Sequence, residues 1–248
     1  MSPGSMGGRL AGGRRMLVVS AHSADFVWRA AGTIANNTAA GGCTTVVALS
    51  FGERGESGEL WKEPGQTEAA VKAIRRSEAE KAAAVIGAEL VCLDLGDYPL
   101  TVGDAAIARL ADVVRSVSPN VVITHPALDP FNPDHPVAHQ ATLRARLLSS
   151  GAGVASAFET VAPSQLFVFE PHQPELCGFV PTDFVDITGS FAAKQQAMEA
   201  MAAQKYLQQY YAERAGHRGN HARKVTGDPA VRYAEAFQRL TPQVVGVL

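Results

Sequence analysis

Three residues of the sequence have the side chains and spacing of a metal site: His22, Asp25 and His135. His22 and Asp25 stand three positions apart after an apolar run, so both side chains can reach one ion across a single turn. His135 follows an aspartate in a second polar segment, which we expect to be a loop. A His-Asp-His set leaves one coordination position open for water, which a catalytic zinc ion makes more acidic. The residues therefore predict a catalytic Zn²⁺ site, with one ion per chain.

Alternating strand and helix patterns indicate the elements that must position these residues. They predict an α/β fold, a Rossmann-like three-layer sandwich with a mostly parallel sheet. The expected strands are Met16–Ala21, Thr44–Ser50, Leu90–Leu95, Asn120–Thr124, Gln165–Phe169 and Phe184–Thr188. The expected helices are Val27–Ala40, Gln66–Ile86, Asp104–Val117, Val137–Leu148 and one long helix, Phe191–Tyr211.

Ionisable residues are concentrated directly after the predicted strands. The segments AHSADF, FGERGES, GDYP and HPALDPFNPDHPVAH follow the first four strands. Parallel α/β sheets bind their ligands at the carboxyl ends of the strands. We therefore expect these loops to converge on one rim, with the metal site at its centre.

Composition narrows the class of protein further. The 248 residues are 46% hydrophobic, carry a formal net charge of -2 and contain no polar linker, which favours one catalytic domain over residues 15–248. Residues 1–14 are expected to be a disordered extension. The charge balance argues against a nucleic-acid partner, and no apolar run approaches the ~20 residues of a membrane helix. The separated Cys43, Cys92 and Cys177 are typical of reduced thiols in a cytoplasmic protein.

Several motifs resemble the PIG-L/LmbE family over about Met16 to Phe237. They are AHSAD, AGTIA at Ala31–Ala35, RRSEAEKAAAVIGA at Arg75–Ala88, NPDHPVAH at Asn132–His139, VDIT at Val185–Thr188, Lys194 and YAEAF at Tyr233–Phe237. The resemblance implies an LmbE-like fold and zinc ligands at His22, Asp25 and His135. Most members of the family hydrolyse N-acetyl groups on sugars.

The sequence departs from the deacetylases of that family at two catalytic positions. Their motif is A-H-P-D-D-E, in which the first aspartate is the general base, and here that position is Ala24. Losing a general base typically costs ~100-fold to 10,000-fold in rate. Asn132 stands where a deacetylase usually has a histidine that assists the oxyanion. Amide hydrolysis by the usual route is therefore disfavoured, although the metal ligands remain.

Longer motifs resemble the 4-oxalomesaconate hydratases of gallate-type aromatic catabolism. They are AHSADFVWRA, LSFGERGES, GDYP, DPFNPDHP and FEPHQPE. The resemblance implies a hydro-lyase that adds water to the C=C bond of 4-oxalomesaconate and gives 4-carboxy-4-hydroxy-2-oxoadipate. Glu56, in the polar segment after the second strand, is the first candidate for proton transfer, and the resemblance favours it. His172, in a proline-flanked segment after a strand, is the second candidate, because histidine exchanges protons near neutral pH. We expect each substitution, Glu56→Gln or His172→Ala, to lower kcat by at least ~100-fold with zinc retained.

The small polycarboxylate substrate would need arginine, whose planar fork binds carboxylate in a bidentate manner. Arg54 is the first candidate, and Arg214 and Arg218 are further ones. Asp134 and His139 are expected beside the ligands, where they would orient them. By analogy with this architecture we also expect a homo-oligomer.

Two other functions stay open on the sequence. The chain could be a zinc N-deacetylase of a small amidosugar in which Glu56 or Asp134 replaces the missing base. It could also be an inactive paralogue that retains its metal. An NAD-binding module is disfavoured because no GxGxxG motif follows the first strand.

Overall fold

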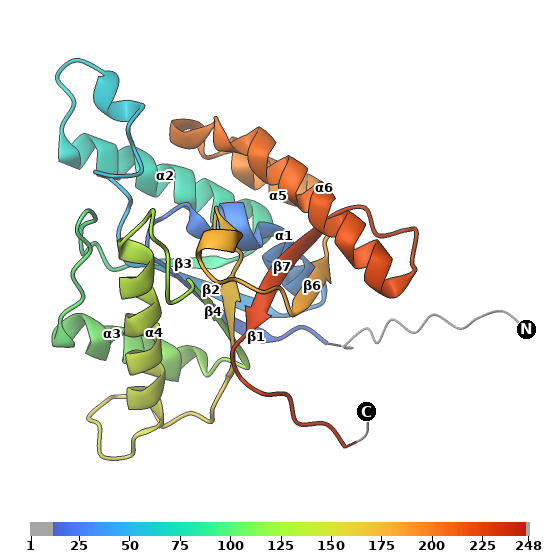
Figure 1. Ribbon diagram of the computed structural model, residues 1–248. Helices are drawn as coiled ribbons and strands as arrows, with labels where there is room; N and C mark the ends of the chain where they lie inside the picture. Colours follow the sequence, from blue (N-terminus) through green and yellow to red (C-terminus); the bar gives the residue numbers. More distant parts are fainter. Residues whose placement is uncertain (1–11, 247–248) are drawn as a thin grey trace, which may run out of the picture.

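The computed structural model describes residues 12–246 and contains a seven-stranded sheet with helices on both faces (Figure 1). Its strand order is β3-β2-β1-β4-β5-β7-β6. Strands β1 to β5 pair in parallel, whereas β7 is antiparallel to β5 and β6. The strands are β1 (Arg15–Ser20), β2 (Cys43–Ala48), β3 (Glu89–Cys92), β4 (Val121–Thr124), β5 (Gln165–Phe169), β6 (Asp183–Asp186) and β7 (Ala234–Arg239). The prediction of an α/β sandwich with a mostly parallel sheet is confirmed.

Six α-helices of the described residues form the two outer layers (Figure 1). Helices α3 and α4 pack together on one face, and α1, α2, α5 and α6 lie on the other. The helices are α1 (Asp25–Ala39), α2 (Glu68–Ile86), α3 (Asp104–Val117), α4 (Asp134–Ser150), α5 (Phe191–Glu199) and α6 (Leu207–Thr226). None of the described helices is long and apolar enough to cross a membrane.

The environment of the interior strand β1 explains why its sequence is a continuous apolar run. Val18 packs into the core beneath α1 and α2, whereas its neighbours Leu17 and Val19 pack into the core beneath α3 and α4. Successive side chains of a strand point to opposite faces, so a strand covered on both sides must be apolar throughout. This burial fixes the end of β1, and with it the position of the loop that carries His22.

The single long helix expected over Phe191–Tyr211 is wrong. Helix α5 ends at Glu199, a short 3-10 helix follows at Ala202–Gln204, and α6 begins at Leu207. The intervening sequence has no glycine or proline, so tertiary contacts cause the break. The backbone N–H of Ala203 donates to Glu78 (2.8 Å), and the amide oxygen of Gln204 accepts from Arg75 (2.9 Å). These contacts outweigh helix propensity, which is a weak preference.

The region near the C-terminus differs from expectation in one further way. Strand β7 has no counterpart among the predicted elements, although it closes the sheet against β5 and β6. The predicted N-terminal extension, residues 1–14, lies outside the described residues as far as residue 11.

A buried ion pair ties α1 to β7 and α5. The Glu235 carboxylate accepts from the backbone N–H groups of Gly32 (3.1 Å) and Thr33 (2.7 Å). It also accepts from the Lys194 ammonium (2.6 Å), which in turn donates to the backbone oxygen of Trp28 (2.8 Å). All polar atoms of this pair are therefore engaged, and loss of either partner leaves a buried charge alone.

Glu235→Ala is expected to lower the free energy of unfolding by about 3–5 kcal/mol, because Lys194 stays buried without its partner. The exposed pair of Lys62 and Glu59 (2.6 Å) provides a matched control. Glu59→Ala should change the same quantity by less than about 1 kcal/mol. Denaturant unfolding of both variants measures the difference, and equal shifts would contradict the structural role of the buried pair.

Candidate active site

The loops at the carboxyl ends of β1 to β5, together with the segment between α5 and α6 and the start of α6, line a cavity of about 260 Å³. It lies where a parallel α/β sheet places its ligands. Helix α1 begins beside it at Asp25, and helix α4 begins beside it at Asp134. The residues around the cavity include His22, Ala24, Asp25, Arg29, Glu56, Asp129, His135 and His172.

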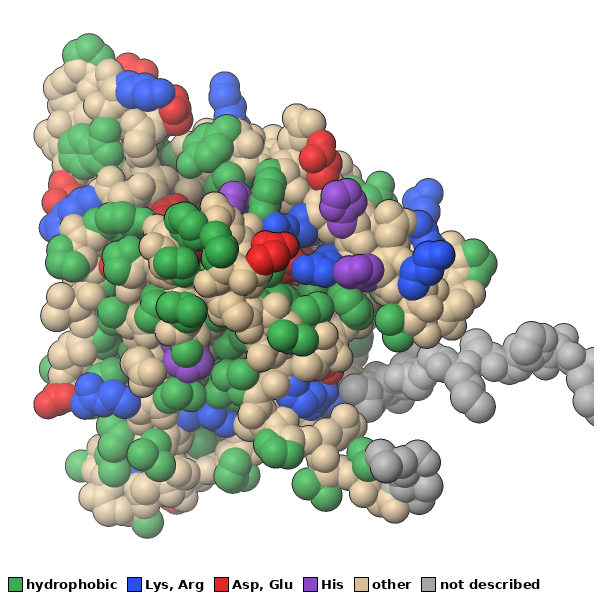
Figure 2. Space-filling model, viewed as in Figure 1, with side chains coloured by type: hydrophobic (Ala, Val, Ile, Leu, Met, Phe, Trp, Pro, Cys, Tyr) green, Lys and Arg blue, Asp and Glu red, His purple; other side chains and the backbone are tan. Residues whose placement is uncertain are grey.

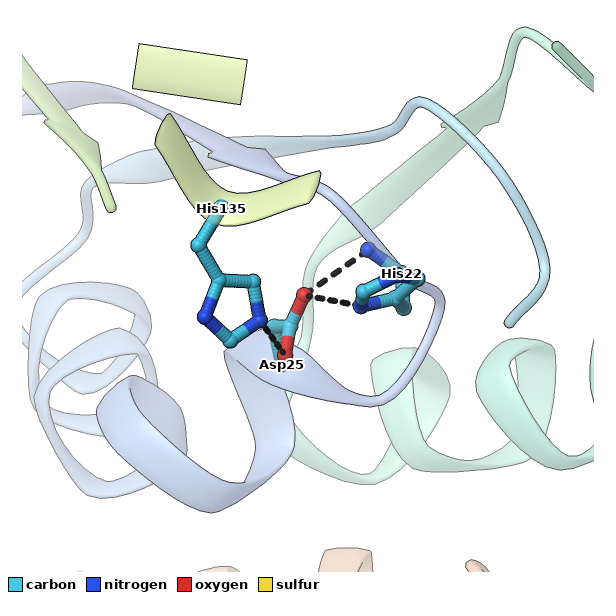
Figure 3. Close-up of side chains that lie close together, drawn as sticks. All are labelled: His22, Asp25 and His135. Atoms are coloured by element: carbon cyan, nitrogen blue, oxygen red, sulfur yellow. Dashed lines mark hydrogen bonds and ion pairs between the residues drawn. The ribbon is translucent and has the colours of Figure 1, made fainter. Parts of the chain in front are cut away.

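The three predicted metal ligands lie together at this cavity (Figure 3). One ligand atom each of His22, Asp25 and His135 lies within 4.8 Å of the others, and all three residues are buried. The Asp25 carboxylate faces both imidazoles: Oδ2 is 3.5 Å from His22 Nδ1, and Oδ1 is 3.7 Å from His135 Nε2. The spacing read from the sequence thus corresponds to one cluster of two nitrogen donors and one carboxylate.

The ring nitrogens that point toward Asp25 are suited to a metal ion. His22 Nδ1 and His135 Nε2 are buried and have no hydrogen-bond partner among the described residues. The opposite nitrogens are both held by carboxylates: His22 Nε2 lies 3.2 Å from Asp134, and His135 Nδ1 lies 2.8 Å from Asp129. A carboxylate behind a histidine fixes the ring and makes it a better ligand. The residues present therefore fit a divalent cation.

The electrostatics of the cluster also favour a cation. Burial alone would lower the pKa of His22, but the carboxylates of Asp134 and Asp25, together with Glu56, raise it to about 10. Burial alone would raise the pKa of Asp25, but His125 and Arg29 hold it well below its usual range. The carboxylates around His22 therefore favour positive charge at this position.

Local structure explains how His135 reaches the cluster. The expectation of a loop is wrong at this point, because Asp134 and His135 form the first turn of α4. The Asn132 side-chain oxygen accepts from the N–H of Asp134 (3.1 Å), as a residue before a helix often does. Asp129 Oδ1 accepts from the N–H of Phe131 (3.0 Å), while its Oδ2 accepts from His135. One aspartate therefore shapes the loop and orients the ligand.

The two predicted supporting residues have different surroundings. Asp134 contacts His22 directly and also accepts from the backbone N–H groups of Tyr98 (3.0 Å) and Leu100 (2.9 Å). His139 is bonded instead to the backbone oxygen of His125 (2.8 Å), and so supports the strand end rather than a ligand. The His125 ring stacks on His135, with centroids 4.0 Å apart. Burial and the neighbouring His135 lower the pKa of His125 to about 3, so its ring is neutral.

Glu56 lies at the edge of the cluster and is held in place by two amides. Its Oε1 accepts from the Asn132 amide (2.8 Å), and its Oε2 accepts from the Gln204 amide (2.9 Å). Oε1 also lies 4.0 Å from His22 Nδ1. The break between α5 and α6 matters here, because it brings Gln204 to Glu56.

His172 lies at the cavity, in the segment after β5. Its Nδ1 is 3.5 Å from the Tyr211 hydroxyl, and its ring stacks on Tyr210 with centroids 4.2 Å apart. Burial lowers the pKa of His172, and the charges of Arg29 and Arg214 lower it further. The ring is therefore neutral near pH 7, and one of its nitrogens can accept a proton.

The three arginines predicted to bind substrate are engaged elsewhere. Arg54 bonds to Glu68 (3.2 Å) and to the backbone oxygen of Asp97 (3.0 Å), and it is not among the residues around the cavity. Arg214 and Arg218 both pair with Glu170. On the face seen in Figure 2, basic and histidine side chains gather over α6 beside acidic ones. The role of Arg54, Arg214 and Arg218 in substrate binding stays a prediction.

Arg29 and Gln204 are among the residues at the cavity that were not singled out from the sequence. Arg29 follows Asp25 by four positions, so both side chains share one face of α1, and its guanidinium pairs with the Asp25 carboxylate. That spacing was a usable signal. Gln204 had none, because it reaches the cavity only through the break after α5.

Comparison with known proteins identifies related sequences over almost the whole chain. Residues 17–146 match the family model described as PIG-L, GlcNAc-PI de-N-acetylase. A 4-oxalmesaconate hydratase of Pseudomonas putida is 45% identical over 231 residues, which is 92% of this chain and 90% of that protein. The crystal structure of GalB, a 4-carboxy-2-hydroxymuconate hydratase from Pseudomonas putida, matches with a TM-score of 0.92 and 44% identity. That match covers 94% of this chain and 98% of GalB.

More distant deacetylases share the fold. The N,N'-diacetylchitobiose deacetylase from Pyrococcus horikoshii matches with a TM-score of 0.76 over 92% of this chain and 84% of that chain, at 19% identity. At this level of identity the match supports a common architecture and nothing about the reaction. Sequence likeness along the chain is therefore much stronger to the two hydratases than to this deacetylase.

Proposed function

The chain belongs to the PIG-L family, and from that premise we propose that it is a hydratase acting on 4-oxalomesaconate. The observation that carries the proposal is the 45% identity to a hydratase over 92% of the chain. The two Pseudomonas putida matches carry names that refer to 4-oxalmesaconate and to 4-carboxy-2-hydroxymuconate, which are the keto and enol forms of one tricarboxylate. The proposed substrate is therefore a small trianion.

The cavity supports a hydratase better than a deacetylase. At the position where deacetylases carry their catalytic aspartate, Ala24 lines the cavity with a methyl group that cannot accept a proton. Asp134 is a poor substitute, because its oxygens already accept from two backbone N–H groups and contact His22. In the deacetylase alternative, Glu56 or Asp134 would replace the missing general base, and only Glu56 remains a candidate for that role.

The proposed metal is Zn²⁺, held by His22, Asp25 and His135. When bound there, it would supply Lewis acidity toward an oxygen atom of a reactant. Asp134 and Asp129 would hold the two imidazoles in the orientation that their hydrogen bonds already define.

Hydration of the C=C bond attaches a hydroxyl group to one carbon and a proton to its neighbour, so one water molecule is consumed. We assign proton removal from water to Glu56, because its carboxylate lies next to the cluster and is held by Asn132 and Gln204. We assign delivery of the proton to the neighbouring carbon to His172, which is neutral and lines the same cavity, so that it can take up a proton and pass it on. The proton that Glu56 removes from water replaces the one delivered, so both side chains return to their starting states. General acid-base steps of this kind contribute about 100- to 10,000-fold each.

Two assays on metal-analysed protein test the proposal. Loss of 4-oxalomesaconate is followed by absorbance, and acetate release is measured with N-acetylated amino sugars. Hydration that is lost on chelation and restored by zinc is the expected result. Acetate release without hydration would favour the deacetylase, and bound metal without either activity would favour an inactive paralogue.

His172→Ala is expected to lower kcat by about 100-fold, because the site loses a group that exchanges a proton with the substrate. The metal content should be unchanged, since His172 makes no contact with the cluster of His22, Asp25 and His135. The exposed His217 on α6 provides a matched control, and His217→Ala should behave as the wild type. Steady-state kinetics decide the question, and wild-type turnover by His172→Ala would remove His172 from the mechanism.

A further inference from the structure

Arg29 is the only lysine or arginine among the described residues that line the cavity. It is buried in the second turn of α1, and Asp25, Glu56 and Asp129 line the same cavity. A trianionic substrate entering a space with three carboxylates needs fixed positive charge at the walls. Within the protein, Arg29 is the side chain that supplies a permanent one.

The guanidinium of Arg29 is only partly engaged. Its Nη1 donates to Asp25 Oδ1, which is also the carboxylate oxygen nearest to His135 Nε2. Its Nε is buried and has no hydrogen-bond partner among the described residues. A buried N–H without an acceptor is costly. Because Arg29 lines the cavity, a carboxylate bound there is a candidate acceptor for its guanidinium.

The other candidate arginines lack this freedom. Arg214 donates to Glu170 (3.1 Å) and to the backbone oxygens of Pro171 (2.8 Å) and His172 (2.9 Å). Arg218 is bidentate to the same Glu170 carboxylate (3.0 Å to each oxygen). These two side chains hold the segment of His172 in place, and neither lines the cavity at the metal cluster.

We propose that Arg29 binds one carboxylate of the substrate, with Asp25 holding the other side of its guanidinium. The proposal rests on the proposed function, which supplies the tricarboxylate. Arg29 would then be a specificity-determining residue, because it selects a ligand with a carboxylate at one position. Asp25 pairs with Arg29 and also belongs to the proposed metal site, so the bound carboxylate would be held at a fixed place relative to that site. Arg29, Glu56 and His172 line the same cavity, so the anchored carboxylate would lie in the space that both proton-transferring groups share.

Binding of saturated analogues tests the proposal without turnover. The probes are propane-1,2,3-tricarboxylate and two dicarboxylates that each lack one of its carboxylates, propane-1,2-dicarboxylate and propane-1,3-dicarboxylate. Calorimetric titration compares zinc-loaded wild type with Arg29→Lys and Arg29→Met. Lysine keeps a positive charge beside Asp25 but lacks the planar fork. Arg29→Lys therefore still tests the proposal if Arg29→Met does not fold. Arg109→Met, at an exposed position of α3, is the control.

Arg29→Lys is expected to weaken binding of the tricarboxylate by about 10- to 100-fold, the range of a hydrogen bond to a charged group. It should have little effect on the dicarboxylate that lacks the contacted carboxylate, because the interaction is already absent. Metal content and melting temperature should match the wild type. Wild-type affinities in Arg29→Lys, or the same fold-loss for all three probes, would overturn the proposal.

The result separates this inference from the proposed function. If wild type does not hydrate 4-oxalomesaconate but the Arg29 variant loses tricarboxylate binding selectively, the function is wrong and the anchoring role of Arg29 stands. If wild type hydrates 4-oxalomesaconate and the variant binds all probes normally, the function stands and the role of Arg29 is wrong.

Discussion

Replacing Glu56 with glutamine is expected to lower kcat for hydration by about 100- to 10,000-fold, because an amide cannot take a proton from water. Glutamine has nearly the same shape, so the cavity should keep its volume. Its amide nitrogen would, however, face the donor amide of either Asn132 or Gln204, each of which now bonds to one carboxylate oxygen, whereas its oxygen could still accept from the other. KM should change much less than kcat, since Glu56 acts on the reacting water rather than on the substrate carboxylates.

A matched substitution separates proton transfer from a general effect of charge. Glu63 is an exposed residue of the same segment between β2 and α2, and Glu63→Gln should leave kcat unchanged. The metal content of Glu56→Gln should equal that of the wild type, because Glu56 is outside the cluster of His22, Asp25 and His135. Near-normal turnover by Glu56→Gln would remove Glu56 as the base and reopen the assignment.

The grouping of His22, Asp25 and His135 was predictable from the sequence because these residues are tied to regular structure. His22 follows a strand that is buried on both faces, and Asp25 opens the next helix. In a parallel sheet the end of each such strand lies at the same rim, so the position of a residue after a strand predicts its place in space. His135 follows the same logic after β4, although it lies in a helix rather than a loop.

The arginines show where such reasoning fails. Arg54 follows β2 and was expected at the rim, but the neighbouring Glu68 and the backbone of Asp97 hold its side chain away from the cavity. A long, flexible side chain is placed by its partners, and partners distant in sequence are not visible in a local pattern. Arg29 is placed by Asp25, which is only four residues away, and so its position followed from helix geometry alone.

The break after α5 could not be predicted for a related reason. Its sequence has good helix formers throughout, and the contacts that end the helix come from Glu78 and Arg75 on α2. Those contacts place Gln204 against Glu56. The position of the proposed base therefore depends on packing between α2 and the segment after α5.

Removing the metal is expected to abolish hydration, and His135→Ala should have the same effect by removing one of three ligands. The substitution leaves His22 and Asp25 as the only ligands of the cluster, and two ligands hold a divalent ion far more weakly than three. Asp129→Asn should have a smaller effect, lowering metal affinity by about 10- to 100-fold, because Asp129 only orients His135. Metal analysis after dialysis, together with hydratase assays across added zinc, measures both effects.

The comparison of how far added zinc restores each variant distinguishes a metal site from a structural role. If the cluster had only a structural role, His135→Ala and Asp129→Asn would both melt at a lower temperature. Added zinc would then not restore hydration in one variant more than in the other. A metal site predicts that added zinc restores Asp129→Asn at high concentration but not His135→Ala, because only the former retains all three ligands. The exposed His217→Ala variant should need no added zinc. Full hydration by chelated wild-type protein would show that the reaction does not depend on a metal at this cluster.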